Sequence, residues 1–168
     1  MSDSDPQGTS QEEKAEQGKE LYLEALQLIE RLHRQFLDVV KAELDRMDIK
    51  DCNNVQALIL YNIGADEMTV GELTTRGYYL GSNVTYNLKK LVENGFVEQE
   101  RSAHDRRSVR IRLSVKGQEL HVFMENLYHK HVQALGEGVL ETEALAGINN
   151  SLRTLERFWA DQLRFSGR

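Results

Sequence analysis

The sequence predicts a mainly α-helical fold with one small β-hairpin, and three observations support this prediction. Apolar residues recur every three or four positions from Leu21 to Met47 and again through the last third of the chain. Strand-like runs flank a basic turn only between Phe96 and Leu113. The single proline is Pro6, so the rest of the chain lacks the strongest helix breaker. We therefore expect a compact centre flanked by long helices.

Composition limits the class of protein. A chain of 168 residues suits one domain, or a small domain with long dimerising helices. Its one cysteine, Cys52, excludes an internal disulfide, and no apolar run approaches the ~20 residues that span a bilayer. The polar N-terminus has no hydrophobic signal core. We expect a soluble, cytoplasmic protein without a cofactor or a metal.

The N-terminal third divides at about residue 18. Residues 1–18 lack apolar periodicity and are expected to form a flexible polar tail that orders only as an extension of the next helix. Residues 19–50 are expected to form a long dimerisation helix. Its apolar stripe is wide enough for two neighbours, and the second can belong to another chain.

Residues 51–114 are expected to form a compact lobe. Asp51 to Asn54 supply N-caps for a helix from Val55 to about Ile63, which Gly64 closes. The pair Thr69 and Glu72 forms a capping box for a short helix that ends near Arg76-Gly77. A turn then leads into a longer helix over 82–94, so the pattern predicts a helix-turn-helix.

A hairpin and two more helices complete the chain. The runs 96–101 and 109–113 are predicted to be strands joined by a basic turn, which gives the outline of a winged helix-turn-helix. Ser114 is expected to cap a helix that ends at Gly136, and Thr142 to cap the last helix. Residues 115–168 carry more apolar surface than the lobe can cover, which predicts C-terminal dimerisation helices.

Charge is distributed unevenly along the chain. The formal net charge is -6, which argues against a protein that coats nucleic acid or an anionic membrane. From Thr69 to Ser114, however, eight basic residues face five acidic ones, so this segment is +3 and the remainder is -9. A basic face on an acidic body is expected of a protein that meets phosphate with one surface.

Two groups of residues are therefore candidates for DNA contact. The exposed faces of the 82–94 helix carry Ser82, Asn83, Thr85, Tyr86, Lys89 and Lys90. The hairpin tip and the strand after it carry Asp105, Arg106, Arg107 and Arg110. Polar side chains at a helix N-terminus suit base edges or phosphates, and arginine suits a narrow minor groove. The structural alternatives are that Ser82 and Asn83 only cap the helix and that the tip is a solvated charged turn.

These motifs resemble the MarR family of dimeric winged-helix transcriptional regulators. The family's wing reads Asp-x-Arg, followed by a strand that ends in Leu-Thr-x-x-Gly. Here the first motif is Asp105-Arg106-Arg107, and the second runs from Leu113 to Gly117 with serine in place of threonine. The similarity covers about residues 54–120 in motif and the rest in helix layout.

The resemblance implies a homodimer that binds a pseudo-palindromic operator in double-stranded DNA and acts as a repressor. It places Ser82, Asn83, Thr85 and Tyr86 at groove-reading positions and Arg107 at the minor groove. Tyr86 stands where many relatives carry arginine, so a guanine contact is not carried over. A small aromatic or anionic ligand is expected between the dimer helices and the lobe, with a pocket drawn from the end of the first helix, the second helix and the start of the fifth.

Other functions are weaker alternatives. Cys52 is a candidate redox sensor beside a helix N-terminus, although a small buried side chain is the simpler interpretation. His121, Glu125 and His129 share one helical face but do not close a tetrahedral metal site. A winged helix used only for protein contact would lack the basic wing tip. No sequence motif indicates an enzyme.

Overall fold

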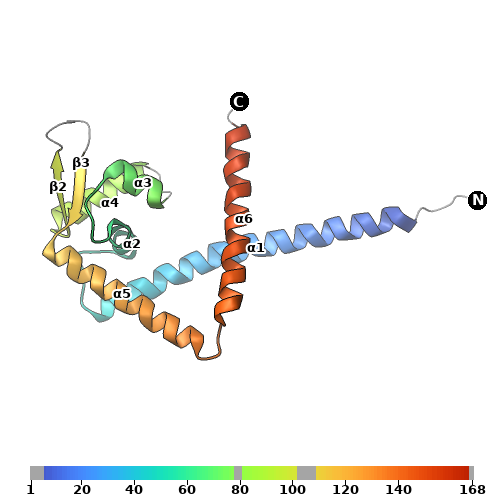
Figure 1. The fold of residues 1–168 in the computed structure, drawn as a ribbon, viewed down its shortest axis with the longest axis horizontal. Helices are drawn as coiled ribbons and strands as arrows, with labels where there is room; N and C mark the ends of the chain where they lie inside the picture. Colours follow the sequence, from blue (N-terminus) through green and yellow to red (C-terminus); the bar gives the residue numbers. More distant parts are fainter. Residues whose placement is uncertain (1–5, 78–80, 102–108, 167–168) are drawn as a thin grey trace, which may run out of the picture. The chain divides into compact units, whose positions relative to one another are not determined.

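The computed structural model describes residues 6–77, 81–101 and 109–166. In chain order the elements are α1 (Pro6–Arg46), α2 (Asn54–Ile63), β1 (Met68–Thr69), α3 (Val70–Gly77), α4 (Gly81–Glu93), β2 (Val97–Arg101), β3 (Val109–Leu113), α5 (Val115–Gly136) and α6 (Thr142–Ser166) (Figure 1). They fall into two compact units, residues 1–118 and 119–168. The predicted mainly α fold with a winged helix-turn-helix is confirmed.

Helix α1 is longer than the sequence predicts. It begins at Pro6, so residues 6–18 extend the helix, which is the only way in which this segment was expected to become ordered. Proline suits the first turn of a helix, and the residues after it are rich in Gln, Glu, Ala and Lys, which favour helix. The side chains of residues 11–20 are all exposed. Propensity, not burial, therefore accounts for this extension.

Helix α2 is fixed by caps at both ends. The Asn53 side chain accepts a hydrogen bond from the Gln56 amide at 2.9 Å, and the Gln56 side chain accepts one from the Asn53 amide at 3.0 Å. This is a second capping box, which the sequence prediction missed. At the other end Gly64 adopts a positive φ of 70°, as the predicted glycine stop requires. Asn54 ties the helix to α1 through a 2.9 Å bond to the Leu37 carbonyl.

The sheet has three antiparallel strands in the order β1-β3-β2. Strands β2 and β3 pair from Val97 opposite Leu113 to Arg101 opposite Val109, which confirms the predicted hairpin to within one residue. Strand β1 was not predicted. It has only two residues, Met68 and Thr69, and pairs with Ile111 and Arg110. So short a strand leaves no alternation in the sequence.

The turn after α4 brings the hairpin against the start of α5. Gly95 has a φ of 77°, and the Phe96 amide donates to the Leu91 carbonyl at 2.9 Å, which closes α4. Ser114 caps α5 as predicted, because its hydroxyl oxygen accepts from the Gly117 amide at 3.1 Å. A Cβ at Gly117 would lie 2.1 Å from the Phe96 carbonyl oxygen. Only glycine fits this approach.

The core of the first unit is formed by the helices α1, α2, α3 and α4 together with the sheet. Its fully buried side chains include Val40, Leu44, Ile59, Leu60, Ile63, Leu73, Val84, Leu91 and Ile111. Each such side chain contributes about 1.5–3 kcal/mol relative to its exposed state. Within this core, α2 packs against α1, α3 and α4.

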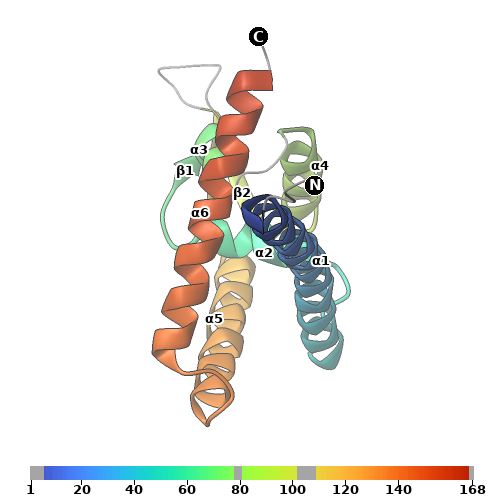
Figure 2. The ribbon, with the colours of Figure 1, turned by 90° about the vertical axis from the view of Figure 1, so that its right-hand side faces the viewer.

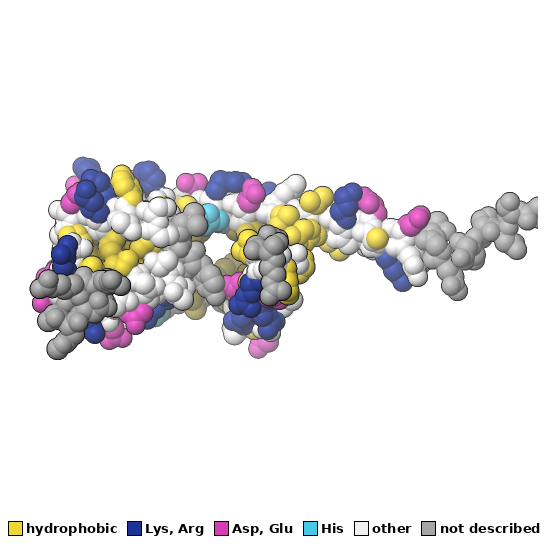
Figure 3. Space-filling model, turned by 90° about the horizontal axis from the view of Figure 1, so that it is seen from above, with side chains coloured by type: hydrophobic (Ala, Val, Ile, Leu, Met, Phe, Trp, Pro, Cys, Tyr) yellow, Lys and Arg dark blue, Asp and Glu magenta, His cyan; other side chains and the backbone are white. Residues whose placement is uncertain are grey.

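Long apolar faces remain exposed on two helices. Helix α6 is one continuous helix (Figure 2) and exposes Leu145, Ile148, Leu152, Phe158 and Leu163. Along α1 the exposed apolar side chains are Leu21, Tyr22, Leu23, Leu28, Leu32, Phe36 and Val39 (Figure 3). None of the described helices is long and apolar enough to cross a lipid bilayer. Exposed apolar stripes of this length are typical of helices that have a partner.

Candidate nucleic-acid interface

Helix α4 separates a buried apolar face from an exposed polar one. Val84, Leu88 and Leu91 are buried, and Tyr86 is 62% exposed. The first group of predicted contact residues lies on this helix: Ser82, Asn83, Thr85, Tyr86 and Lys89 are exposed, and Lys90 is half-buried. The exposed residues of the first two turns meet at the positive end of the helix dipole. This arrangement can present hydrogen-bonding groups to a groove of DNA.

The side chains on this face differ in what they can offer. The Thr85 hydroxyl donates to the Gly81 carbonyl at 2.8 Å, so its hydrogen is used within the helix and its oxygen can only accept. Asn83 is bonded to Asn87, a buried residue that sequence reasoning missed. The signal was present, because Asn87 interrupts the apolar stripe between Val84 and Leu88.

The two lysines of α4 share one carboxylate. Lys90 donates to Glu93 at 2.8 Å, and the Lys89 ammonium lies 3.8 Å from the same side chain. The hydrogen bond from Lys90 lowers the pKa of Glu93, and its pairing with Glu93 raises the pKa of Lys90. Two cations facing one anion leave a net charge of about +1 at the end of the helix.

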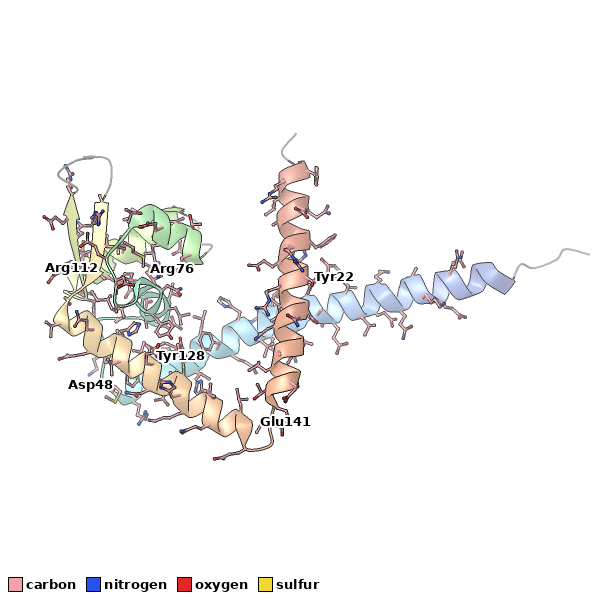
Figure 4. The ribbon with its side chains drawn as sticks, in the orientation of Figure 1. Tyr22, Asp48, Arg76, Arg112, Tyr128 and Glu141 are labelled. Carbon is pink, nitrogen blue, oxygen red and sulfur yellow. The ribbon has the colours of Figure 1, made fainter. Side chains whose placement is uncertain are left out.

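Carboxylates also balance the hairpin arginines. Arg110 pairs with Glu67 at 2.9 Å, and Arg112 on β3 pairs with Glu98 at 2.8 Å (Figure 4 labels Arg112). Asp105, Arg106 and Arg107, the predicted wing tip, lie outside the described residues. Because Arg110 and Arg112 are both paired with carboxylates, they add little unbalanced positive charge to the +3 of residues 69–114.

The start of α3 is held by the predicted capping box. The Glu72 amide donates to the Thr69 hydroxyl oxygen at 3.2 Å, while the Thr69 amide donates to the Glu72 carboxylate at 2.6 Å. The bonds that the Thr69 amide and hydroxyl donate to the Glu72 carboxylate lower the pKa of Glu72. At the far end, Arg76 donates to the Asn62 carbonyl at 3.2 Å (Figure 4 labels Arg76). Both ends of the first helix of the helix-turn-helix are thus fixed.

An open groove of about 730 Å³ lies beside α4. Its lining comes from β1, the start of α3, one face of α4 and the two hairpin strands: Thr69, Val70, Gly71, Thr85, Leu88, Lys89, Val92, Glu93, Gln99 and Val109. The sequence did not predict it. A second pocket of about 320 Å³ is lined by residues of α1, the following loop and the start of α2, without the residues of α5 that the resemblance implies.

Cys52 is buried, with 4% of its surface exposed. Burial, and secondly the charge of Asp51, raise the pKa of Cys52 to about 12, although Lys116 acts in the opposite direction. The thiol is therefore protonated at neutral pH, which disfavours a redox role. Among the described residues, no three His, Cys, Asp or Glu side chains are grouped to hold a metal ion, His121, Glu125 and His129 included.

Comparisons with known proteins identify relatives of this chain. Residues 51–108 match the model of the MarR family. The exopolysaccharide II synthesis transcriptional activator ExpG of Rhizobium meliloti (strain 1021) is 35% identical over 144 residues, which cover 86% of this chain and 74% of ExpG.

Solved structures share the fold. The structure of Streptococcus pneumoniae FabT in complex with DNA has a TM-score of 0.69 at 23% identity and covers 84% of this chain and 99% of its own. The transcriptional regulator SlyA has a TM-score of 0.70 at 16% identity, with 84% and 97% covered. A mutant MarR from E. coli complexed with operator DNA has a TM-score of 0.65 at 22% identity, with 77% and 91% covered. Taken with the family match and the identity to ExpG, this fold establishes that the chain belongs to the MarR family of transcriptional regulators.

Proposed function

We propose that the protein is a homodimeric regulator that binds a pseudo-palindromic operator in double-stranded DNA. Each α4 enters a major groove, and each wing, the turn between β2 and β3, reaches the flanking minor groove. The observation that carries this proposal is the exposed polar face of α4, opposite the buried face that carries Val84, Leu88 and Leu91. Two of the structural neighbours were solved in complex with DNA, which supports DNA binding by this fold.

The direct test is a gel shift against the DNA upstream of the protein's own coding region, with a salt titration. We expect sequence-selective binding at low micromolar protein or better, with affinity that falls as salt rises because phosphate contacts release counterions. A scrambled DNA of equal length is the control. Equal affinity for both DNAs would contradict the proposal.

The groove beside α4 is our candidate for ligand control. Its walls contain Val70, Leu88 and Val92. Lys89 supplies a cation, because the one carboxylate of the lining, Glu93, is already paired with Lys90, so the groove suits a small aromatic anion. Thr85 and Lys89 line the groove and also belong to the proposed DNA face. A bound ligand would therefore compete with DNA and relieve repression.

Gly71→Leu tests the groove by filling it, since Gly71 is part of the lining and a Cβ there meets only the Thr69 hydroxyl oxygen, at 3.9 Å. Benzoate is a suitable probe, with benzyl alcohol as the neutral control. Operator affinity of the wild type should fall as benzoate is added, and that of Gly71→Leu should respond less. An equal response of both proteins in fluorescence anisotropy would exclude this groove.

Activation is a second candidate mode, favoured by the 35% identity to a relative named as a transcriptional activator. The same contacts with DNA serve both modes, since the position of the operator relative to the promoter decides whether the bound protein represses or activates transcription. A reporter driven by the bound promoter distinguishes them. Deletion of the regulator raises expression under repression and lowers it under activation.

A further inference from the structure

Asn87 is a polar residue in an apolar position. It lies on the buried face of α4 with Val84, Leu88 and Leu91, and only 5% of its surface is exposed. Burying an amide costs free energy unless its polar atoms are hydrogen-bonded. A leucine at this place would continue the stripe, so the partners of Asn87 indicate what the amide does.

Among the described residues, Asn87 is hydrogen-bonded to Asn83. The Asn87 side-chain nitrogen donates to the Asn83 backbone carbonyl at 3.0 Å and to the Asn83 side-chain oxygen at 2.6 Å. A backbone carbonyl can only accept, so the Asn87 atom beside it must be the NH₂ group. The Asn83 atom beside the same NH₂ must then be its oxygen. The orientation of both amides is determined by the backbone.

The Asn83 side chain is consequently held with its oxygen toward Asn87. Its NH₂ group, with two N–H donors, forms the other end of an exposed side chain in the first turn of α4. We infer that Asn87 is a positioning residue for sequence choice, because it fixes Asn83 as a hydrogen-bond donor toward the DNA bases. This inference rests on the proposed entry of α4 into the major groove.

The base preference follows from the edges of the base pairs. An asparagine with both ends available pairs with adenine, accepting from N6 and donating to N7. With its oxygen engaged by Asn87, Asn83 offers donors, and guanine presents two acceptors, N7 and O6, in the major groove. The structure therefore favours guanine over adenine at the base that Asn83 meets.

The experiment is selection of binding sites from a random DNA pool, followed by affinity measurements. The position whose preference disappears in Asn83→Ala identifies the base that Asn83 contacts. At that position the wild type should prefer guanine over adenine about tenfold, within the range of a good side-chain contact to a base. Asn87→Leu should reduce the preference to about twofold or less, since the Asn83 amide is then free to turn.

Two further variants separate positioning from general damage. In the Asn83→Ala background, Asn87→Leu should change no base preference further, because its effect passes through Asn83. Asn87→Asp is nearly isosteric but accepts where asparagine donates, so it should turn the Asn83 amide and move the preference toward adenine or cytosine, which present donors. Affinity for random DNA and the melting temperature report on folding.

The outcomes distinguish this inference from the proposed function. A selective wild type whose preference is unchanged by Asn87→Leu and Asn87→Asp would overturn the role of Asn87 alone. That role would also be overturned if Asn87→Leu altered the preference equally with and without Asn83. A wild type that selects no sequence would instead overturn DNA reading by α4, and this inference with it.

Discussion

Individual carboxylates balance much of the positive charge around α4 and the hairpin. Glu93 faces both Lys89 and Lys90, while Glu67 and Glu98 pair with Arg110 and Arg112. These pairs are exposed and worth little to stability, but each reduces the charge available to phosphate. Affinity for DNA is therefore expected to depend on the arginines at the wing tip.

Arg107→Ala should weaken binding to all DNA sequences more than it changes preference among them. The loss of one phosphate or minor-groove contact should also reduce the salt slope of the affinity by about 0.9. Arg112→Ala is the matched control, because Glu98 already neutralises that guanidinium. Unchanged operator affinity of Arg107→Ala in a salt-matched gel shift would show that the wing assignment is wrong.

Cys52 should make stability depend on alkaline pH. Its pKa is raised to about 12 in the folded chain, so burial of the thiol contributes stability that is complete below pH 9 and is lost as pH rises toward 12. Between pH 9 and pH 12, the free energy of unfolding of the wild type should fall by up to about 1.4 kcal/mol per pH unit more than that of Cys52→Ala. Urea unfolding at a series of pH values measures the difference. Parallel profiles of the two proteins would contradict the burial of a neutral thiol.

Among the helices and strands, the junction of α4, β2 and α5 determines where the hairpin stands. Lys116 donates to Asp51 and, at 2.9 Å, to the Asn94 carbonyl, and its ammonium lies 4.1 Å from the centre of the Phe96 ring. Asn94 in turn donates to the Asp51 carbonyl at 2.6 Å. These contacts join the loop before α2 to the end of α4 and the start of α5.

Gly117→Ala should destabilise this junction. The added Cβ would lie 2.1 Å from the Phe96 carbonyl oxygen, so the backbone must move, at a cost of about 1–3 kcal/mol. Gly18→Ala is the control, because nothing lies within 4 Å of its added Cβ in α1, and it should stabilise by about 0.5–1 kcal/mol. Chemical denaturation compares the two. Equal stability of both variants would show that Phe96 does not press on α5.

The elements that sequence reasoning found are those with local signals. Thr69 with Glu72, Ser114, Gly64 and Gly95 mark helix ends through bonds to residues a few positions away. No local sequence pattern predicts strand β1 or the ion pair of Glu67 with Arg110, because both depend on segments that are distant in the chain. The candidate site was found in outline from the polar face of α4. The charge balance of this site and the groove beside it could be identified only from the three-dimensional structure.

For the molecule as a whole, the apolar stripes of α1 and α6 account for the proposed dimer. Leu32 is 59% exposed and Phe158 is 50% exposed. Exposed apolar side chains that recur along whole helices are unfavourable on the surface of a monomer. A two-fold partner would cover both stripes and set the distance between two copies of α4.

Leu152→Arg should shift the protein from dimer to monomer at micromolar concentration and lower its operator affinity. A charge on the α6 stripe would be buried without a partner in the dimer. Val139→Asp is the control, because Val139 is 73% exposed in the segment between α5 and α6. Light scattering after size-exclusion chromatography gives the mass of each. A dimer that survives Leu152→Arg would place the interface elsewhere.

Two copies of α4, held by the dimer, are expected to read two half-sites about one helical turn apart. The decisive measurement is operator affinity, by fluorescence anisotropy, after insertion of five base pairs between the half-sites. Five base pairs make about half a helical turn, so the insertion places the two half-sites on opposite faces of the duplex. We predict that affinity falls toward the non-specific value, a loss on the order of 10³-fold or more. Unchanged affinity for the lengthened operator would contradict paired reading of DNA by the two α4 helices.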